Sequence, residues 1–519
     1  MKTNASVRKI FNQPQLPARN YDSLIAAIAG FFIILAFSRH GGIGVSPDSV
    51  IYISVAANIH DHALINDFTR SPLMDFPAFY PIFLSGIMFL SGMDVMHFGP
   101  VLNGVLFGII IYLSGWMMER FSFRSKWYKW ILLSLIVFSP CLLEIYSMIW
   151  SETLFLLLLL IFIICTRRYF LSHHTKALLF MALIAGLASV TRYAGVTLIG
   201  TGGLLILFDG NLSANKKVRH LLLFGITAFS LPVLNLYRNK HITGTLTGYR
   251  EKGIVPFSQN LHDFGNVFGD WLPFPNIGYG VAIGTGLFWI IFFIIVFIRR
   301  LIRKQRFFSY ENIAITYFLV YAFFILLTAT ISRFQTLDNR LLSPLFLPWL
   351  WGASCWIPTW IATWTARRRR IVIAAAVVAA ISFQAGQLLD DYETWDGVKY
   401  AGIPGYTEDD WRHSQTMQFV RENRAILQKP GGTLYSNAFE GIWFLTGMRA
   451  DMIPHKDFTR DIGEFLAEKH FYIVWFNDGV NPDLVSIDYI SRYKKLVSEK
   501  IFNDGAVYYF VTDSTMRRP

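Results

Sequence analysis

The chain has 519 residues, of which 53% are hydrophobic and only 16% are charged, against about a quarter charged in an average soluble protein. This composition excludes an ordinary soluble globule. The net charge of +12 would suit a nucleic-acid partner in a soluble protein, so its meaning depends on where the basic residues lie. The cysteines, Cys141, Cys165 and Cys355, all stand in apolar runs, which predicts neither disulfides nor a thiolate metal site.

Apolar segments recur along most of the chain, and a helix that spans a bilayer needs about 20 mainly apolar residues. Residues 76–92 are apolar but short and rich in proline and aromatic residues, so we interpret them as a re-entrant or interface-lying helix. Charged residues or Gly/Pro clusters bound about eleven other segments, predicted to be membrane-spanning helices: 22–39, 98–118, 129–146, 150–166, 177–191, 193–208, 220–237, 278–298, 312–331, 341–364 and 371–388.

Lysine and arginine gather in alternate loops between these segments. The N-terminal tail, 1–21, and five later loops hold 23 of the 47 basic residues. Because such residues stay on the cytoplasmic side, the pattern predicts a multi-pass membrane protein with a cytoplasmic N-terminus. Loop 40–97 and everything after about residue 389 then lie on the outer face. The charge is thus a topology signal and gives no support to nucleic-acid binding.

Residues 389–519 have the mixed composition of a small folded domain. Strand-like runs at 433–436, 472–476 and 506–511 alternate with helical stretches at 410–427, 459–469 and 487–500. The predicted fold class is therefore mainly α: a polytopic transmembrane domain, 22–388, followed by an extracytoplasmic α/β domain.

The first outer loop carries the most informative polar residues. Ser46-Pro47-Asp48 reads as a helix start, after which Tyr52, Ala56 and Ile59 fall on one face of an amphipathic helix lying along the membrane. Asp48 is either a helix-capping acid or a general base at the water–lipid boundary, where it would be ionised and within reach of an acceptor proton.

Several short motifs follow one another in a familiar order. The D-x-x-x-Y-x-x-x-A pattern from Asp48 and FPAFYP at 76–81 precede WSETLF, AGLASVTRYAG, YRNKHITG, DNRLLSPL and YSNAFEGIWFLTG. Together they resemble the GT-C membrane glycosyltransferases, related to protein O-mannosyltransferases and the lipid A aminoarabinose transferase. The resemblance implies an enzyme of the bacterial inner membrane whose outer face is periplasmic. It also implies inverting sugar transfer from a polyprenyl-phosphate-linked donor, with Asp48 as catalytic base.

The leaving phosphate needs cations near the membrane surface, and we expect the base to stay clear of them so that it remains basic. Arg192, between two apolar stretches, either binds phosphate or pairs with Glu152. Tyr237-Arg238-Asn239 is read as a helix end that clamps the donor or anchors the interface. The candidate donor-binding residues are Arg192, Arg238, Arg250, Lys252, Arg333 and Arg340.

Two of these arginines, Arg333 and Arg340, flank Asp338 in a short outer loop, where an Asp–Arg pair is the alternative to phosphate binding. The candidate substrate-binding residues are Tyr52, Asp67, Glu152 and Tyr193.

A metal site in the first outer loop is not favoured. His60, Asp61, His62 and Asp67 are candidate ligands, but the histidines lack the i,i+4 spacing of a helical pair and the loop has no D-x-D motif. We therefore predict no metal ion or other cofactor.

The predicted function is a glycosyltransferase whose partners are a polyprenyl-phosphate sugar, the lipid bilayer and a glycan, lipid or protein acceptor. Two alternatives share the many spans: a transporter or lipid-linked sugar flippase, and an O-antigen polymerase or ligase. An active and folded Asp48→Asn variant would remove Asp48 as the base.

Overall fold

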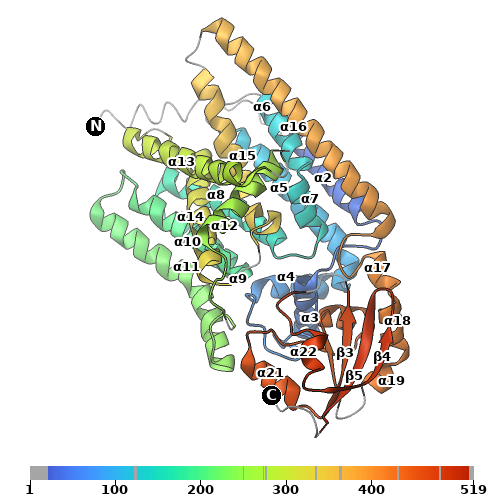
Figure 1. Cartoon of the computed structure of the whole chain (residues 1–519). Coiled ribbons are helices and arrows are strands. Elements are labelled where there is room, and N and C mark those ends of the chain that lie inside the picture. The colour runs from blue at the N-terminus through green and yellow to red at the C-terminus, as the bar shows by residue number, and fades with distance from the viewer. Residues whose placement is uncertain are drawn as a thin grey trace.

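The computed structural model describes residues 21–513, apart from 122–125, 249, 273, 275–276, 305, 334–335, 362–364, 429–431 and 478–480. The predicted N-terminal tail, 1–21, lies outside the described residues except for Tyr21. The rest forms a helical domain, residues 21–401, and a C-terminal domain, residues 402–513, which lies at one end of the helices (Figure 1).

Each predicted span has a helical counterpart. The helices are α2 (Tyr21–Phe37), α5 (Val95–Met118), α6 (Lys126–Val137), α7 (Pro140–Ser147), α8 (Glu152–Ser172), α9 (Thr175–Thr191), α10 (Val196–Leu207), α11 (Ala214–Thr243), α13 (Tyr279–Arg303), α14 (Tyr310–Ile331), α15 (Asn339–Ile361) and α16 (Ala366–Ala401), with α12 (Phe257–Trp271) as an additional helix.

Among the described residues, six helices are long and apolar enough to cross a membrane, or seven if the bent pair α6 and α7 is one span. The chain is therefore a polytopic membrane protein, while the number of eleven spans stays a prediction. The predicted span 129–146 is broken, because Ser139 caps α7, Pro140 opens it, and the two helices differ in direction by 46°.

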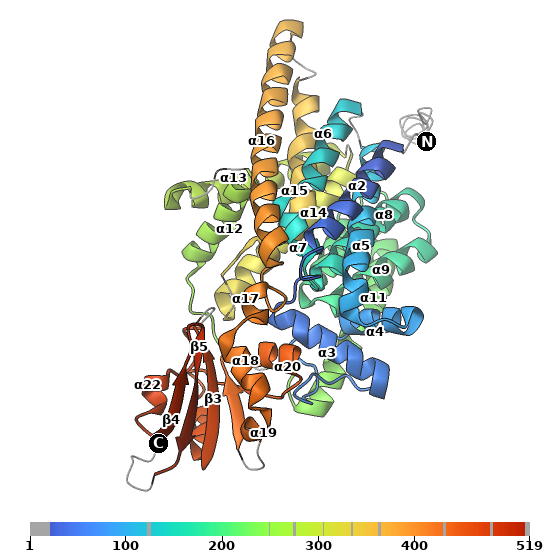
Figure 2. The ribbon, with the colours of Figure 1, turned by 90° about the vertical axis from the view of Figure 1, so that its right-hand side faces the viewer.

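The first loop forms two helices, α3 (Pro47–His62) and α4 (Phe79–Ser91), which pack on one another beside the C-terminal domain. In Figure 2, α4 lies across the lower end of α5. With 13 residues α4 is shorter than a spanning helix requires. Its re-entrant or interface-lying character stays a prediction.

The C-terminal domain is built on a sheet of order β2-β1-β3-β5-β4. Its first three strands are parallel: β2 (Asp451–Met452), β1 (Thr433–Ser436) and β3 (His470–Phe476). The antiparallel hairpin of β4 (Lys495–Ile501) and β5 (Gly505–Val511) completes it. The strand predictions at 433–436, 472–476 and 506–511 are confirmed. The helices around the sheet are α17 (Asp409–Arg412), α18 (Gln415–Glu422), α19 (Arg424–Leu427), α20 (Phe439–Thr446), α21 (Thr459–Ala467) and α22 (Ile487–Ile490).

Two helix predictions in this domain are wrong. The stretch 487–500 is helical only in α22 and then becomes the edge strand β4. Asn503-Asp504 makes the tight turn that pairs this strand with β5, closed by the Phe502 N–H donating to the Gly505 carbonyl at 2.8 Å. The stretch 410–427 is divided into α17, α18 and α19, and Ser414 starts α18 by accepting a hydrogen bond from the Met417 N–H at 2.9 Å.

The two domains join differently from the expected boundary, since α16 runs through residue 389 to Ala401 without a break. The segment after it is fastened to the segment before α3. The Tyr406 N–H donates to the Val45 carbonyl at 2.8 Å, and the Thr407 hydroxyl donates to the Ile43 carbonyl at 3.2 Å. Gly405 has φ +120°, and a Cβ there would lie 2.4 Å from the Val45 oxygen, so only glycine fits.

Candidate active site

A short backbone pairing brings two helix N-termini together. The Gly44 N–H donates to the Ser147 carbonyl at 2.9 Å, and the Ile149 N–H donates to the Gly44 carbonyl at 3.1 Å. The buried Asn103 amide holds this segment by donating to the Tyr146 and Met148 carbonyls. The N-terminus of α3 consequently lies beside that of α8.

The start of α3 is built as the sequence predicts. Ser46 and Ser49 form a reciprocal capping box, Pro47 stands in the first turn, and Asp48 follows it. The Trp150 indole N–H donates to the Ser46 hydroxyl at 2.8 Å, which ties this cap to the N-terminus of α8. The predicted helix start is confirmed, and Asp48 takes no part in the capping box.

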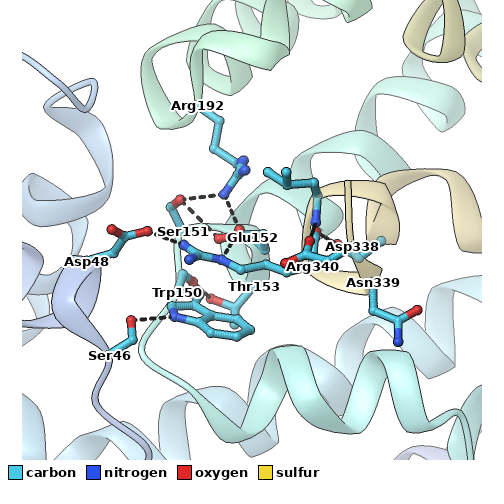
Figure 3. Close-up of polar contacts among 12 residues, drawn as sticks. Ser46, Asp48, Trp150, Ser151, Glu152, Thr153, Arg192, Asp338, Asn339 and Arg340 are labelled. Carbon is cyan, nitrogen blue, oxygen red and sulfur yellow. Dashed lines mark hydrogen bonds and ion pairs between the residues drawn. The ribbon is translucent and has the colours of Figure 1, made fainter. Parts of the chain in front are cut away.

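Glu152 is the centre of the site (Figure 3). Its side chain is fully buried, and a single carboxylate oxygen accepts from Nε of Arg340 at 2.7 Å and pairs with Nη1 of Arg192. Arg340 also reaches outward, where its Nη2 donates to the Asp48 carboxylate at 2.5 Å. Asp48 is the most exposed of the four, with 26% of its side chain accessible. The result is a continuous ion-pair chain from buried Glu152 to accessible Asp48.

Ser151 links this chain to α3. Its hydroxyl accepts from Nη1 of Arg192 at 3.1 Å and lies 3.2 Å from the Tyr52 hydroxyl. Burial, followed by the charge of Asp48, raises the pKa of Tyr52, so this phenol stays protonated. The Arg340 guanidinium lies 4.2 Å from the centre of the Trp150 ring, a cation–π contact.

Arg192 owes its position to a sharp chain reversal. It follows α9 in an extended conformation, and one turn of 3-10 helix, Tyr193–Gly195, leads into α10. A Cβ on Gly195 would lie 2.3 Å from the Ala188 carbonyl, so the reversal requires glycine. This turn places a guanidinium, 14% exposed, in the interior of the helical domain.

The arrangement is suited to an anion next to a carboxylate. Two guanidinium groups and the N-termini of α3 and α8 supply positive potential, which phosphate groups favour. Glu152 neutralises part of it and holds both arginines in place. Asp48 occupies the accessible end, where a second reactant can approach.

One expectation about Asp48 is wrong. We expected the base to stay clear of the cations, but Asp48 is hydrogen-bonded to Arg340. A carboxylate held in this way must give up the contact before it takes a proton. Arg340 also pairs with Asp48 and Glu152 instead of Asp338, whose carboxylate accepts from the Leu341 N–H.

The other predicted residues lie apart from this chain. Tyr193 donates through its hydroxyl to the Met74 carbonyl at 2.8 Å, and Arg238 donates to the Leu73 and Ile65 carbonyls. Asp67 accepts three hydrogen bonds within its own turn, from Thr69 and Ser71. These side chains shape the loop between α3 and α4. Arg238 is inside α11, which continues to Thr243, so the helix end predicted at 237–239 is wrong.

Arg333 joins the two domains. It pairs with Glu251 at 2.5 Å and, in the C-terminal domain, with Asp457 at 2.8 Å and Asp483 at 2.6 Å. It does not pair with Asp338 among the described residues. Lys252 is exposed, beside the backbone bridge that its segment forms with Ser332.

Arg250 lies near Asp75, in the loop before α4. Burial raises the pKa of Asp75, and the charge of Arg250 opposes the rise. Arg250 is itself exposed. This pair therefore belongs with the loop contacts of Arg238 and Tyr193 and is separate from the chain around Glu152.

The candidate metal ligands do not gather. Within the described ranges, no group of three or more His, Cys, Asp or Glu side chains is arranged to hold a metal ion. His60 instead pairs with its neighbour Asp61 at 2.6 Å, and its ring packs on Phe89.

Two residues of the site were not assigned a role from sequence. Ser151 and Trp150 stand in the WSETLF motif directly before Glu152, yet nothing local predicts that one would bind Arg192 and Tyr52 and the other Ser46 and Arg340. Their place at the start of α8, beside a charged residue, is the only signal in the sequence.

Comparison with known proteins gives structural likeness alone. No family model and no curated protein sequence matches the chain. The structure is similar to crystal structures of ArnT from Cupriavidus metallidurans. For ArnT bound to undecaprenyl phosphate the TM-score is 0.51, with 12% sequence identity over 93% of this chain and 96% of that one. For the apo state the TM-score is 0.50, with the same identity and coverage.

At this identity the likeness establishes the fold and not the chemistry. It extends over both the helical domain and the C-terminal domain, because it covers nearly the whole of each chain. The chain therefore shares the fold of ArnT, in keeping with the resemblance of its motifs.

Proposed function

We propose that the protein is an inverting glycosyltransferase that moves a sugar from a polyprenyl-phosphate-linked donor to an acceptor hydroxyl. The observation that carries the proposal is the ion-pair chain from Glu152 through Arg340 to Asp48, with Arg192 on the same Glu152 oxygen. The likeness to a structure of ArnT bound to undecaprenyl phosphate supports a lipid-linked phosphate as the ligand.

The geometry suggests how the groups divide the reaction. The donor phosphate would take over the Arg340 contact now made by Asp48, and Arg192 would add a second guanidinium. Asp48, released from Arg340, would accept the hydroxyl proton of the acceptor as its oxygen bonds to the anomeric carbon. The bond from that carbon to the phosphate oxygen breaks on the opposite side, and its electron pair leaves with the lipid phosphate. The proposal requires neither a metal ion nor an organic cofactor.

Among the other predicted donor ligands, Arg238, Arg250, Lys252 and Arg333 are assigned to holding loops and domains together, because their contacts lie away from Glu152. Asp67 and Tyr193 are assigned to the same scaffold. Tyr52 is assigned to the site because its hydroxyl is hydrogen-bonded to Ser151.

The experiment is sugar transfer from a radiolabelled undecaprenyl-phosphate sugar to a cell-envelope fraction. Wild type should form labelled product, and Asp48→Asn should lose at least about a hundredfold in rate, the scale of general-base catalysis. Asp61→Asn, an exposed carboxylate on the same helix, is the matched control. An active and folded Asp48→Asn variant would show that Asp48 is not the base.

The same assay separates the alternative functions. Movement of an intact lipid-linked sugar across vesicle membranes without product would favour a flippase. Transfer only from diphosphate-linked oligosaccharides would favour a polymerase or ligase.

We also propose that the site faces the periplasm. The C-terminal domain lies at the end of the helices away from the basic start of α16, as Figures 1 and 2 show. All three cysteines are buried, so a Glu422→Cys variant places one reactive thiol on the exposed surface of this domain. A membrane-impermeant maleimide should label it in intact spheroplasts. Labelling only after the membrane is broken would show that the C-terminal domain faces the cytoplasm instead.

A further inference from the structure

The tryptophan that ends α12 is bonded to the residue before Arg340. The indole N–H of Trp271 donates to the side-chain carbonyl of Asn339 at 3.0 Å. Asn339 is the first residue of α15, and Arg340 is the second. In Figure 3 the Asn339 side chain points away from the guanidinium of Arg340. The contact between α12 and the site therefore runs through Asn339.

The start of α15 depends on its neighbours for support, because the first N–H groups of a helix have no partner within the helix. The Tyr321 hydroxyl of α14 donates to the Leu341 carbonyl at 2.8 Å, and the Cys141 thiol of α7 lies 3.7 Å from the Asn339 carbonyl oxygen. Successive side chains leave a helix about 100° apart. A bond that fixes the Asn339 side chain consequently also fixes the direction in which Arg340 leaves α15.

Trp271 differs from the tryptophans packed around it. It is 4% exposed, and its ring lies against that of Trp349 of α15, with ring centres 5.5 Å apart. Trp289 of α13 packs on the other side of this cluster, 5.4 Å from Trp349. Among the described residues, the indole N–H groups of Trp289 and Trp349 have no hydrogen-bond partner. The cluster thus holds tryptophans with unpaired N–H groups, so burial alone does not account for the bond from Trp271 to Asn339.

Arg340 is consequently held at both ends. Glu152 accepts from its guanidinium at 2.7 Å, and Trp271 holds the backbone end through Asn339. An arginine has a long and flexible side chain, and a binding group has to be held within about 0.5 Å of its productive position. Either anchor alone would leave the other end of the side chain free to move.

Resting on the proposed function, we propose that Trp271 is a positioning residue for donor binding. It holds Asn339, and with it the first turn of α15, so that Arg340 is in place when the lipid phosphate arrives. Trp271 acts through Asn339 and touches neither the phosphate nor the reacting atoms. This role accounts for α12, a helix that none of the predicted spans includes.

The experiment measures binding of radiolabelled undecaprenyl phosphate to the purified full-length protein in detergent. Trp271→Phe keeps an aromatic ring in the cluster but removes the donor, and its affinity should fall about three- to tenfold, the scale of one hydrogen bond. Asn339→Leu removes the acceptor and should fall by the same factor, and the double variant should fall no further. Asn339 is partly exposed, so Asn339→Leu tests the same bond if Trp271→Phe does not fold.

Sugar transfer from a labelled undecaprenyl-phosphate sugar supplies a second readout. Losing the bond lowers the fraction of molecules in which Arg340 is in place, and a bound phosphate restores that placement. The KM for the donor should therefore rise by the same factor as the dissociation constant, while kcat stays within about twofold of wild type.

Trp349→Phe is the matched control, because it changes a tryptophan of the same cluster whose N–H is unpaired. Its affinity and KM should stay within about twofold of wild type even where the unfolding temperature falls.

Each result bears on a different statement. Unchanged affinity in Trp271→Phe overturns the proposal. An equal loss of affinity in Trp349→Phe also overturns it and assigns Trp271 to packing alone. A double variant in which the two losses multiply would show that Trp271 does not act through Asn339. If the wild-type protein binds no undecaprenyl phosphate, the proposed function itself fails and the role of Trp271 fails with it.

Discussion

Arg340 and Asp48 are joined by a hydrogen bond of 2.5 Å although 292 residues separate them in the chain. The same guanidinium is anchored from behind by Glu152. A ligand phosphate that binds Arg340 must therefore compete with a carboxylate of the protein, and this competition gives the first prediction.

Asp48→Asn should bind undecaprenyl phosphate more tightly while losing transfer. The amide leaves Arg340 without its outer negative partner, so the phosphate no longer displaces a charge. We expect a gain of about five- to tenfold in affinity, which corresponds to roughly 1 to 1.4 kcal/mol. Tryptophan fluorescence titration at fixed pH measures it. Weaker binding than in wild type would show that Asp48 and the phosphate do not share Arg340.

Glu152→Gln should destabilise the helical domain. Glu152 is fully buried and pairs with both Arg192 and Arg340, so its neutral replacement leaves Arg192 without this carboxylate and Arg340 with Asp48. Breaking a buried ion pair costs about 3–5 kcal/mol, which should lower the unfolding temperature in detergent. The exposed Glu464→Gln, which loses only a surface pair with Arg460, should leave it unchanged. Equal unfolding temperatures would contradict the central role of Glu152.

Arg333→Gln should loosen the C-terminal domain without changing the affinity for undecaprenyl phosphate. The arginine joins Glu251 to Asp457 and Asp483 across the domain boundary. We expect faster limited proteolysis near residues 402–412 and an unchanged fluorescence titration. Arg340→Gln should behave in the opposite way, with weaker binding of the phosphate. If Arg333→Gln weakens binding about tenfold, Arg333 is a phosphate ligand after all.

The C-terminal domain should lose stability in acid partly through Asp504. Burial raises the pKa of this carboxyl, but hydrogen bonds from Ser414 and Thr416 outweigh burial and lower it overall. A lowered folded-state pKa contributes stability that is present above the unfolded value, about 4, and is lost as the pH falls through the folded value. Hydrogen exchange of the β4–β5 hairpin between pH 6 and pH 3 measures this. In Asp504→Asn the hairpin should be less protected at pH 6 and should change less with pH.

Local signals in the sequence predicted the local parts of the site. Ser46-Pro47-Asp48 specifies a capped helix start through its own side chains, and that start is present. The pairing of Glu152 with Arg192 was one of two alternatives, because a buried arginine needs a carboxylate nearby. The contact of Arg340 with Asp48 depends on how α15 packs against the first loop, and no spacing in the sequence encodes it.

The errors in the fold have a similar cause. The stretch 487–500 mixes polar and apolar residues and was predicted to be helical, but pairing with β5 makes its second half a strand. The apolar composition of 129–146 predicts a single span, although Ser139-Pro140 carries the signal for a new helix start. Pairing with β5 therefore determines the structure of 495–501, and the Ser139 cap determines where α7 begins.

The bonds between the segment before α3 and the segment after α16 set a rule for building chimeras. An exchange of C-terminal domains between proteins of this fold would separate Tyr406 from its partner Val45 if it were cut at the end of α16 alone. The exchanged unit has to include residues 41–45 together with 402–513. Acceptor preference, if it resides in this domain, would then transfer only with that N-terminal strip, which leads directly into the helix of Asp48.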